Sequence, residues 1–321
     1  MTNEAHRYQS ENTAKLGQVA VLYGGQSAER EISILGGKAV LLGLQEAGVD
    51  AIGLDVGDDW MERLEALNVD RAFIQLHGSG GEDGVVQGLL ETMGLPYTGS
   101  GVQASALAMD KIRCKQYWLE EGIATPPFAV LESSSDWAQI LESLGGSVMV
   151  KPASEGSSLG MSKAETASEL AEAWHLAAQF DAHVLAEQWL SGAEYTVAIL
   201  NDSALPTIKL ETEREFYDYQ AKYIADDTRY LCPCGLSAEQ DAAMQALAVK
   251  AYKSLGCRAW GRVDLMIGGD GQIYVLEVNT VPGMTDHSLV PMAAVAAGMS
   301  FAELVVEILL GSMAQPSELG Q

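Results

Sequence analysis

Polar side chains near the C-terminus are spaced as a metal site on two strands would require. The apolar segments 261–267 and 272–279 are separated by only four residues, three of them glycine, and this spacing predicts a β-hairpin. Side chains on a strand alternate between its two faces, so one face is expected to be apolar and the other polar. The polar face is expected to carry Arg262, Asp264, Met266, Val275, Glu277 and Asn279.

The expected register brings two carboxylates near each other. With Ile267 opposite Gln272, Asp264 and Glu277 lie diagonally across the hairpin, with backbones about 7 to 8 Å apart. Both carboxylates could then hold hard cations through oxygen ligands. The pattern therefore predicts a metal site, and the alternative is a solvated polar face with an ion pair.

A second feature is a lysine followed by a loop of small residues. Lys151 follows the apolar run 147–150, and the segment 153–160 offers backbone N–H groups and hydroxyls that could close over a triphosphate. The order of residues is not that of a P-loop. Lys111 and Lys222 could converge on the same phosphates. The alternatives are a mobile surface loop and two surface lysines.

Residues at the ends of other strands could bind a nucleoside or a substrate. The segment 187–190 closes an apolar run and could offer backbone groups to an adenine edge, while Glu194 could hold ribose hydroxyls. His77, at another strand end, is expected to be a site residue rather than a structural histidine. The glycine turns at 24–25 and 78–84 lack dinucleotide-binding spacing, so that type of site is disfavoured.

The hydrophobic pattern predicts the elements that must position these residues. Short apolar runs that alternate with helical patterns indicate a parallel α/β domain over 18–105. A compact α+β unit over 106–190 follows, and then strands, the hairpin and terminal helices over 191–321. Residues 1–17 are expected to be a flexible tail. The fold class is therefore a combination of α/β and α+β units.

Composition narrows the possible partners. The chain of 321 residues carries 19 Lys plus Arg against 44 Asp plus Glu, and its net charge of -25 repels nucleic acid and anionic membranes. No stretch fits a signal peptide or a membrane-spanning helix. Four cysteines without zinc or disulfide spacing favour a reduced compartment. We therefore expect a cytoplasmic protein with neither a nucleic-acid nor a membrane partner.

Six motifs, in this order along residues 18–312, resemble those of the D-alanine:D-alanine ligase family of the ATP-grasp superfamily. They are G-G-x-S-x-E-R-E-x-S at 24–33, L-H-G-x-x-G-E-D-G at 76–84, P-Y-T-G-S-G at 96–101, K-P-x-x-x-G-S-S-x-G at 151–160, G-R-x-D at 261–264 and E-x-N-T-x-P-G-M-T at 277–285. The resemblance implies an ATP-grasp fold with an N-terminal α/β domain, and a homodimer.

The resemblance also implies a two-step ligation. The carboxylate of one D-alanine attacks the γ-phosphate of ATP and gives an acyl phosphate. The amine of a second D-alanine then attacks that carbonyl, and phosphate leaves. The product, D-alanyl-D-alanine, is a precursor for peptidoglycan synthesis, and so for the cell wall and cell shape.

Residue roles follow from the same resemblance. Glu29 resembles the anchor of the first ammonium group, and is expected to link through Ser157 to Tyr223 in a lid over 215–223. The residues that match catalytic positions are Glu29, Ser157, Tyr223, Arg262 and Gly283, the last two as stabilisers of the oxyanion. The residues that match substrate contacts are His77, Lys222 and Ser288.

The nucleotide and metal positions are implied in the same way. The residues that match ATP contacts are Lys111, Lys151, Ser158, Glu187, Trp189, Leu190 and Glu194. The residues that match the ligands of two Mg²⁺ ions, for which Mn²⁺ can substitute, are Asp264, Glu277 and Asn279. This metal set agrees with the carboxylate pair predicted on the hairpin.

Two other functions fit parts of the pattern. An ATP-grasp ligase for a different carboxylate and amine is disfavoured by Glu29 together with His77 and Tyr223. A two-domain binding protein without catalysis is disfavoured by the combination of Lys151 with the three metal-type residues of the hairpin. Phosphate release with a panel of substrates would test the first alternative, and magnesium-dependent ATP turnover would test the second.

Overall fold

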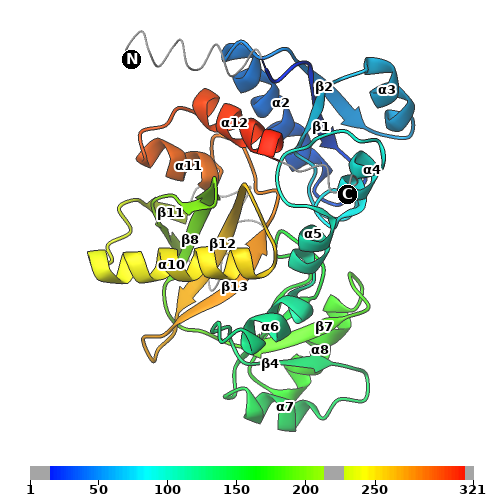
Figure 1. Cartoon of the computed structure of the whole chain (residues 1–321). Helices are drawn as coiled ribbons and strands as arrows, with labels where there is room; N and C mark the ends of the chain where they lie inside the picture. The colour runs from blue at the N-terminus through cyan, green and yellow to red at the C-terminus, as the bar shows by residue number, and fades with distance from the viewer. Residues whose placement is uncertain (1–14, 213–227, 315–321) are drawn as a thin grey trace.

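The computed structural model describes residues 15–212 and 228–314. Lys222, Tyr223 and the predicted lid over 215–223 lie outside the described residues. Three β-sheets, each with its helices, form an N-terminal, a central and a C-terminal unit (Figure 1). The N-terminal and central units lie at opposite ends, and the C-terminal unit contacts both.

The N-terminal unit is a small parallel sheet with helices around it. Its elements are β1 (Val19–Gly24), α2 (Arg30–Glu46), β2 (Ala51–Val56), α3 (Trp60–Leu67), β3 (Arg71–Ile74), α4 (Val85–Thr92) and α5 (Val102–Met109). The strands pair in the order β2-β1-β3, all parallel, as the alternation of apolar runs and helical patterns predicts. Side chains from the helices cover the sheet, so β3 and most of β1 are buried.

The structure corrects the predicted tail at Leu16. The sequence predicts flexibility up to residue 17, but the Leu16 side chain is fully buried in the core of the N-terminal unit. Its carbonyl accepts a hydrogen bond of 2.5 Å from Nε of Arg71, at the start of β3. Burial of one leucine contributes about 1.5–3 kcal/mol. The residues that precede Leu16 are mostly polar, so composition does not reveal that Leu16 is buried.

The central unit is an antiparallel sheet with three helices, two of which pack against each other. Its elements are α6 (Lys111–Glu120), β4 (Phe128–Leu131), α7 (Trp137–Ser143), β5 (Val148–Pro152), β6 (Ser162–Ala164), α8 (Ala167–Ala177) and β7 (Val184–Gln188). The strand order is β4-β7-β5-β6. Glu187 on β7 lies opposite Met149 on β5, and Lys151 is two residues further along β5. Lys151 and Glu187 therefore project from the same face of the sheet.

The C-terminal unit is a six-stranded sheet with β9 paired to β8 at one side. Its elements are β8 (Glu194–Leu200), β9 (Ser203–Ala204), β10 (Ile208–Thr212), β11 (Thr228–Leu231), α10 (Ala238–Ser254), β12 (Trp260–Ile267), β13 (Ile273–Asn279), α11 (Leu289–Ala296), α12 (Phe301–Leu310) and the 3₁₀ helix η1 (Gly311–Ala314). The sheet order is β11-β10-β8-β12-β13.

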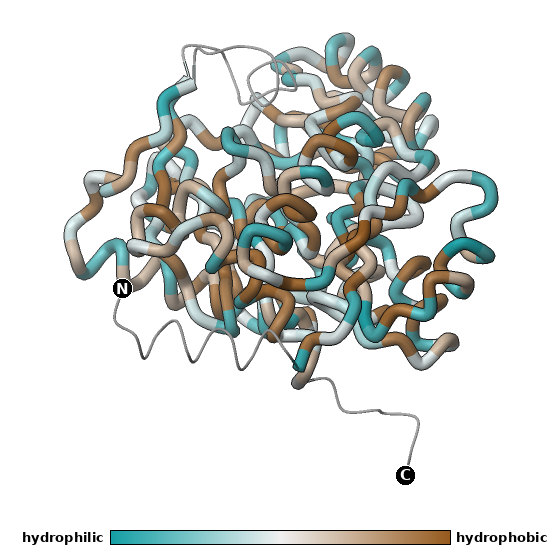
Figure 2. The backbone as a smooth tube through the Cα atoms, turned by 90° about the horizontal axis from the view of Figure 1, so that it is seen from above, coloured by the Kyte–Doolittle hydropathy of each residue, from teal (hydrophilic) through white to brown (hydrophobic). Residues whose placement is uncertain are grey.

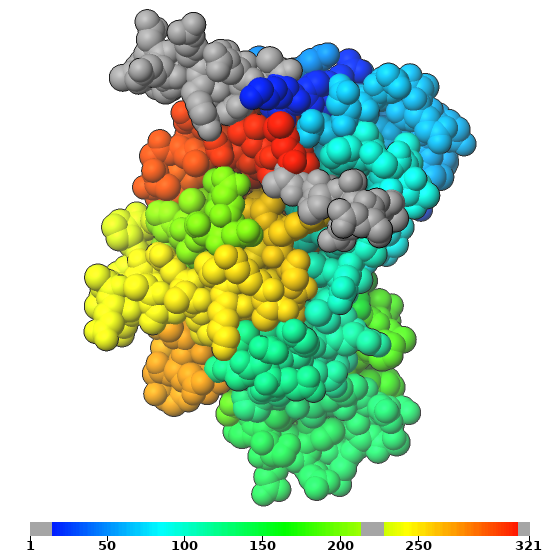
Figure 3. Space-filling model, viewed as in Figure 1, coloured from blue at the N-terminus to red at the C-terminus, as the bar shows by residue number. Residues whose placement is uncertain are grey.

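The C-terminal helices share a core with the N-terminal unit. α12 packs against α2, and in Figure 3 the red C-terminal residues lie against blue residues of the N-terminal unit. An added Cβ at Gly43 would lie 3.0 Å from the Phe301 ring, so this contact favours glycine. Figure 2 shows hydrophobic residues gathered on the inner segments of the fold. In the described part of the chain, no single helix has the length and apolar character needed to cross a membrane.

Candidate active site

Two cavities meet where the three units face one another. The first, of about 790 Å³, lies between the central and C-terminal units. The second, of about 620 Å³, lies between the N-terminal and C-terminal units. Gly156, Ser157 and Glu277 line both cavities. Groups bound in the two cavities can therefore meet at this junction.

The predicted hairpin forms from β12 and β13, but its register differs from the expected one. Asp264 lies directly opposite Glu277 and not diagonally, and Arg262 lies opposite Asn279. A bulge after Asp264 shifts the following pairs by one residue, and Val275 is buried in the core. The expected place of Val275 on the polar face is therefore wrong, because simple alternation does not include a bulge.

Four hydrogen bonds hold the Asp264 carboxylate. Its Oδ1 accepts from Nε of Arg262 at 2.9 Å and from Oγ1 of Thr196 at 2.7 Å. Its Oδ2 accepts from a terminal guanidinium nitrogen of Arg262 at 2.8 Å and from Nδ2 of Asn279 at 3.1 Å. Thr196 is buried on β8, opposite Asp264. It was not predicted, because only the pairing of β8 with β12 brings it here.

The oxygen donors of this hairpin fit a divalent cation whose shell is completed by a ligand. Mg²⁺ usually takes one or two carboxylates together with water and substrate phosphates. Asp264, Glu277 and the amide oxygen of Asn279 supply such a set from paired strand positions. Within residues 15–212 and 228–314, no group of three or more His, Cys, Asp or Glu side chains is placed to hold a metal.

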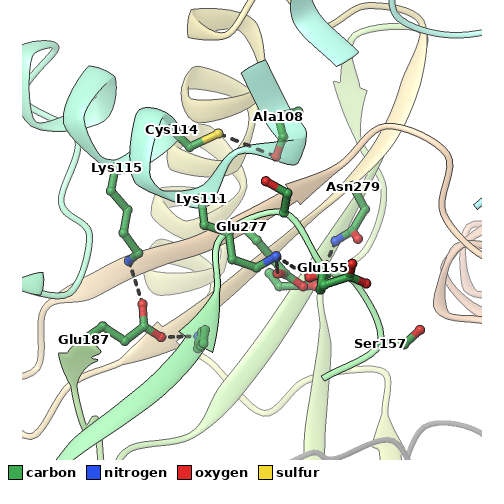
Figure 4. A network of polar contacts seen from close by, with 12 residues as sticks. Ala108, Lys111, Cys114, Lys115, Glu155, Ser157, Glu187, Glu277 and Asn279 are labelled. Atoms are coloured by element: carbon green, nitrogen blue, oxygen red, sulfur yellow. Dashed lines mark hydrogen bonds and ion pairs between the residues drawn. The ribbon is translucent and has the colours of Figure 1, made fainter. Parts of the chain in front are cut away.

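Lys111 connects the glycine-serine loop to β13 (Figure 4). Its Nζ donates to the Glu155 carbonyl at 2.7 Å and lies 3.6 Å from Oε2 of Glu277. Its backbone N–H donates to the Ala153 carbonyl at 3.0 Å. The side chain lines the first cavity beside Glu277. A phosphate in that cavity would meet this ammonium group.

Glu187 lies between two lysines at the floor of the first cavity. It is 3% exposed and forms ion pairs with Lys151 and with Lys115, the latter at 2.8 Å. Burial by itself raises the pKa of Glu187, but the two lysine charges outweigh burial and hold that pKa below its usual range. At Lys151, burial lowers the pKa, but Glu187 outweighs it and raises the pKa overall.

Lys115 was not predicted. It lies one helical turn after Lys111, and that spacing is the sequence signal that could have identified it.

The remaining wall of the first cavity follows β7. The Trp189 ring lies beneath Nζ of Lys163, 4.8 Å from its centroid, and this cation–π contact restrains the ring. The residues predicted to contact ATP all line this one cavity: Lys111, Lys151, Ser158, Glu187, Trp189, Leu190 and Glu194.

In the second cavity, Glu29 and Ser157 join the N-terminal and central units. The Ser157 hydroxyl donates to Oε1 of Glu29, which is 8% exposed. An added Cβ at Gly156 would lie 2.9 Å from the Glu29 carboxylate, so this close approach favours glycine. Ser157 and Ser158 have left-handed φ angles of 53° and 59°, which is a strained backbone turn. The expected partner of Ser157, Tyr223, lies outside the described residues.

His77 lines the second cavity in a fixed tautomer. Its Nε2 lies 3.2 Å from Nε2 of the fully buried Gln75, whose amide also donates to the Pro282 carbonyl. An amide nitrogen only donates, so Nε2 of His77 accepts, and the other ring nitrogen is left to donate to the Val281 carbonyl. Burial lowers the pKa of His77, which favours the neutral ring. Gln75 was not predicted, because nothing in its sequence context indicates burial.

Glu82 adds a buried carboxyl group to the same cavity. It is 9% exposed and accepts a hydrogen bond from the Gly78 N–H at 3.0 Å. Burial, and then the charge of Glu29, raises the pKa of Glu82 to about 8. The group is therefore mostly protonated at neutral pH. The sequence places Glu82 in a glycine-rich motif but gives no sign of this burial.

Arg262, Gly283 and Ser288 form the opposite wall of the second cavity. Oγ of Ser288 accepts from the Thr285 N–H at 2.9 Å, at the start of α11. An added Cβ at Gly283 would lie 2.9 Å from that oxygen. Every predicted site residue that the structure describes thus lines one of the two cavities.

Comparisons with known proteins agree with this arrangement. Residues 117–310 match the family model of the D-ala D-ala ligase C-terminus, and residues 57–100 match that of the N-terminus. The chain is 58% identical over 297 residues to D-alanine--D-alanine ligase of Ectopseudomonas mendocina (strain ymp), covering 92% of this chain and 95% of that protein. It is 56% identical over 299 residues to D-alanine--D-alanine ligase of Stutzerimonas stutzeri (strain A1501), covering 93% and 95%.

Solved structures give the same answer for the fold. D-alanine--D-alanine ligase from Bacillus anthracis superposes with a TM-score of 0.83 at 35% identity, covering 92% of this chain and 97% of that chain. A structure of that ligase complexed with ATP superposes with a TM-score of 0.82 at 32% identity, with the same coverage. The predicted α/β ATP-grasp fold is confirmed. The chain is therefore an enzyme that belongs to the D-alanine--D-alanine ligase family.

Proposed function

We propose that this enzyme joins two D-alanine molecules into D-alanyl-D-alanine, driven by ATP, through an acyl phosphate. The observation that carries the proposal is the junction of the two cavities at Ser157 and Glu277. One cavity is lined by lysines suited to phosphates, and the other by Glu29 and Arg262, which suit an ammonium and a carboxylate. A phosphoryl group can therefore pass from nucleotide to substrate at their meeting point.

The nucleotide would occupy the first cavity. Lys111 and Lys151 would bind its phosphates, the segment 187–190 would hydrogen-bond the adenine edge, and Glu194 would hold the ribose hydroxyls. The backbone N–H groups of the loop 153–160 would donate to phosphate oxygens. The fit of these groups to one cavity supports the assignment.

Two Mg²⁺ ions, for which Mn²⁺ would substitute, would be held by Asp264, Glu277 and Asn279. The ions would neutralise the negative charge that accumulates as phosphate is transferred. A cation that binds Asp264 competes with the Arg262 guanidinium for its oxygens. Cation binding would therefore release the Arg262 side chain from Asp264 toward the second cavity, which Arg262 already lines.

The two substrates would occupy the second cavity in sequence. Glu29 would bind the ammonium group of the first D-alanine, so that its carboxylate faces the γ-phosphate. Arg262 and the Gly283 N–H would stabilise the oxyanion when the second amine attacks the acyl phosphate. Ser288 would contact the second carboxylate, and the neutral ring of His77 would line the substrate pocket.

Exclusion of water is essential because an acyl phosphate hydrolyses readily. The link between Ser157 and Glu29 holds the loop 153–160 across the junction of the cavities. We propose that this link continues from Ser157 to Tyr223, and that Lys222 makes a further contact with the substrate.

The setting of the reaction follows from its product. We place the enzyme in the cytoplasm, as a homodimer, supplying a precursor for the peptidoglycan of the cell wall. The four cysteines support a reducing compartment, because none of them forms a disulfide. Sedimentation velocity at micromolar concentration tests the dimer, since a monomer would sediment with a mass near 34.2 kDa.

The decisive experiment measures ADP release with ATP, Mg²⁺ and D-alanine, repeated with L-alanine and with a panel of other amino acids. We expect release that depends on Mg²⁺ and on D-alanine, with D-alanyl-D-alanine as the product. Turnover with a different carboxylate and amine would identify another ligase of the same fold. Nucleotide binding without any turnover would indicate a binding protein.

A further inference from the structure

Lys115 is a buried charged residue to which the proposed reaction gives no task. Its side chain is 1% exposed, and it lies on α6 one turn after Lys111. Lys111 extends into the first cavity, whereas Lys115 lies beneath the floor of that cavity and points at Glu187 (Figure 4). An isolated ammonium group is costly to bury, so its partners must account for its presence.

The contacts of Lys115 suit an ammonium group. Its Nζ lies 2.8 Å from Oε2 of Glu187 and 2.7 Å from Oγ1 of Thr125. The Thr125 hydroxyl donates its own proton to the Val275 carbonyl at 2.9 Å, so it accepts from Lys115. Lys115 therefore donates a hydrogen bond to Thr125 and forms an ion pair with Glu187.

The charges around Glu187 depend on Lys115. Lys151 and Lys115 flank one carboxylate, so the buried group carries one positive charge in excess. Without Lys115, Glu187 and Lys151 would form a neutral ion pair. Glu187 would then cancel most of the attraction of Lys151 for an anion in the cavity. With Lys115 present, Glu187 is shared and Lys151 retains attraction for an anion in the cavity.

Lys115 also joins two units of the protein. Through Thr125 it reaches the Val275 carbonyl on β13, and the adjacent Ala124 carbonyl accepts from the Val275 N–H at 2.9 Å. Val275 is two residues from Glu277, which lines both cavities. The floor of the first cavity and the carboxylate strand are thus joined by one ion pair and a chain of hydrogen bonds.

We propose that Lys115 is a positioning residue for the nucleotide: it fixes Glu187 from below the cavity floor and thereby leaves the charge of Lys151 available to nucleotide phosphates. The inference rests on the proposed function, because it assumes that a nucleotide occupies the first cavity. Lys115 itself does not touch the nucleotide. It acts through Glu187, and the test must separate this action from a general structural role.

The experiment measures binding of ATP with Mg²⁺ by titration calorimetry in the absence of D-alanine. Lys115→Met removes the ammonium group, and we expect the Kd for ATP to rise at least about tenfold, the typical loss for a buried charged hydrogen bond. Lys115→Arg keeps the charge and should recover most of that loss. The matched control is Arg113→Met, which removes a cation from an exposed position of the same helix, and its Kd should stay within about twofold of wild type.

A double-mutant cycle with Glu187→Gln tests whether Lys115 affects ATP binding through Glu187. If Lys115 acts through Glu187, Lys115→Met should change the Kd less than about threefold in the Glu187→Gln background. An undiminished effect in that background would overturn the inference, as would an unchanged Kd in Lys115→Met alone. Circular dichroism and thermal unfolding show whether each variant is folded.

Thr125→Val is the second variant if Lys115→Met does not fold. It removes one partner of the ammonium group while both charges remain, and we expect a smaller rise in Kd, about threefold, that also disappears with Glu187→Gln. An unchanged Kd in this folded variant would count against the inference. Failure of the proposed function has a different signature: the wild-type protein would then bind no ATP, or would bind ATP without forming D-alanyl-D-alanine.

Discussion

Four hydrogen bonds converge on Asp264, so both oxygens of this carboxylate already have donors before any cation binds. Glu277 differs, because its contact with Lys111 is longer, at 3.6 Å, and its side chain is 25% exposed. The two carboxylates thus have different tasks: Asp264 is held by the sheet, while Glu277 stands at the junction of the cavities. Substitutions at Glu277 should therefore affect activity more than folding.

Glu277→Gln tests this separation. The amide keeps the shape of the side chain but loses the negative charge that a divalent cation requires. We expect turnover to fall at least about tenfold and the unfolding temperature to change by less than about 2 °C. The control, Glu62→Gln on the exposed side of α3, should leave both quantities unchanged. Full activity of Glu277→Gln at limiting Mg²⁺ would contradict the metal assignment.

Glu82 makes a prediction about pH and stability. Its pKa is about 8 in the folded protein against an ordinary value of 4.5, so between these pH values the folded state binds more protons than the unfolded state. The group then destabilises the fold progressively as pH rises through this window. Gln at this position keeps an acceptor for the Gly78 N–H but cannot ionise.

Glu82→Gln should therefore be more stable than wild type at pH 8. We expect its unfolding temperature to exceed that of wild type by at least about 2 °C at pH 8, and the difference to shrink toward pH 5. Differential scanning calorimetry over this range measures it. A difference that does not depend on pH would show that Glu82 does not titrate in the window.

At the scale of elements, hydrogen bonds hold the first residues of the loop 153–160 from two sides. On one side, Lys111 donates to the Ala153 and Glu155 carbonyls. On the other, Oδ2 of Asp181 accepts from the Ser154 N–H at 2.8 Å. Only the tip, with its left-handed serines, extends over the junction of the cavities. A loop held in this way loses less freedom when it binds a ligand.

Asp181→Ala removes one of these attachments. We expect the KM for ATP to rise about three- to tenfold, since the half-buried hydrogen bond that ties Ser154 to a charged group is lost, while kcat changes little. The control is Asp136→Ala, which removes the cap of α7 in the same unit. That variant should lose about 1 kcal/mol of stability and keep its KM. Equal KM changes in both variants would point to general loosening of the central unit.

At the scale of the whole molecule, the site exists only where the three units meet. The Ser157 hydroxyl and the Glu29 carboxylate form the direct link between the central and N-terminal units at the junction. The N-terminal unit is in turn fixed to the C-terminal helices through the shared core of α2 and α12. Loss of the link should therefore open the junction to water without unfolding any unit.

Ser157→Ala tests the link by its effect on coupling. Water that enters the junction hydrolyses the acyl phosphate, so the ratio of ADP released to dipeptide formed should rise above one. We expect at least about a twofold rise, with a lower rate of dipeptide synthesis. The control is Ser154→Ala, which keeps the backbone N–H that binds Asp181. A slow Ser157→Ala enzyme with a ratio of one would mean that the link positions substrate but does not exclude water.

The sequence by itself determined the fold class and the hairpin that carries Asp264 and Glu277 on one face, and it named residues that the structure places along two adjoining cavities. Strand alternation pairs Asp264 with Glu277 on one face without any knowledge of the rest of the chain. Motifs are local, so a phosphate-binding lysine or a glycine loop can be recognised wherever it occurs.

Tertiary structure decided what local patterns cannot contain. The bulge after Asp264 reset the register and buried Val275, because a bulge depends on the strand alongside. Thr196, Gln75 and Lys115 support the site from other elements, and each is ordinary in its own stretch of sequence. Their roles arise from burial and from partners distant in the chain, and so does the raised pKa of a carboxyl such as that of Glu82.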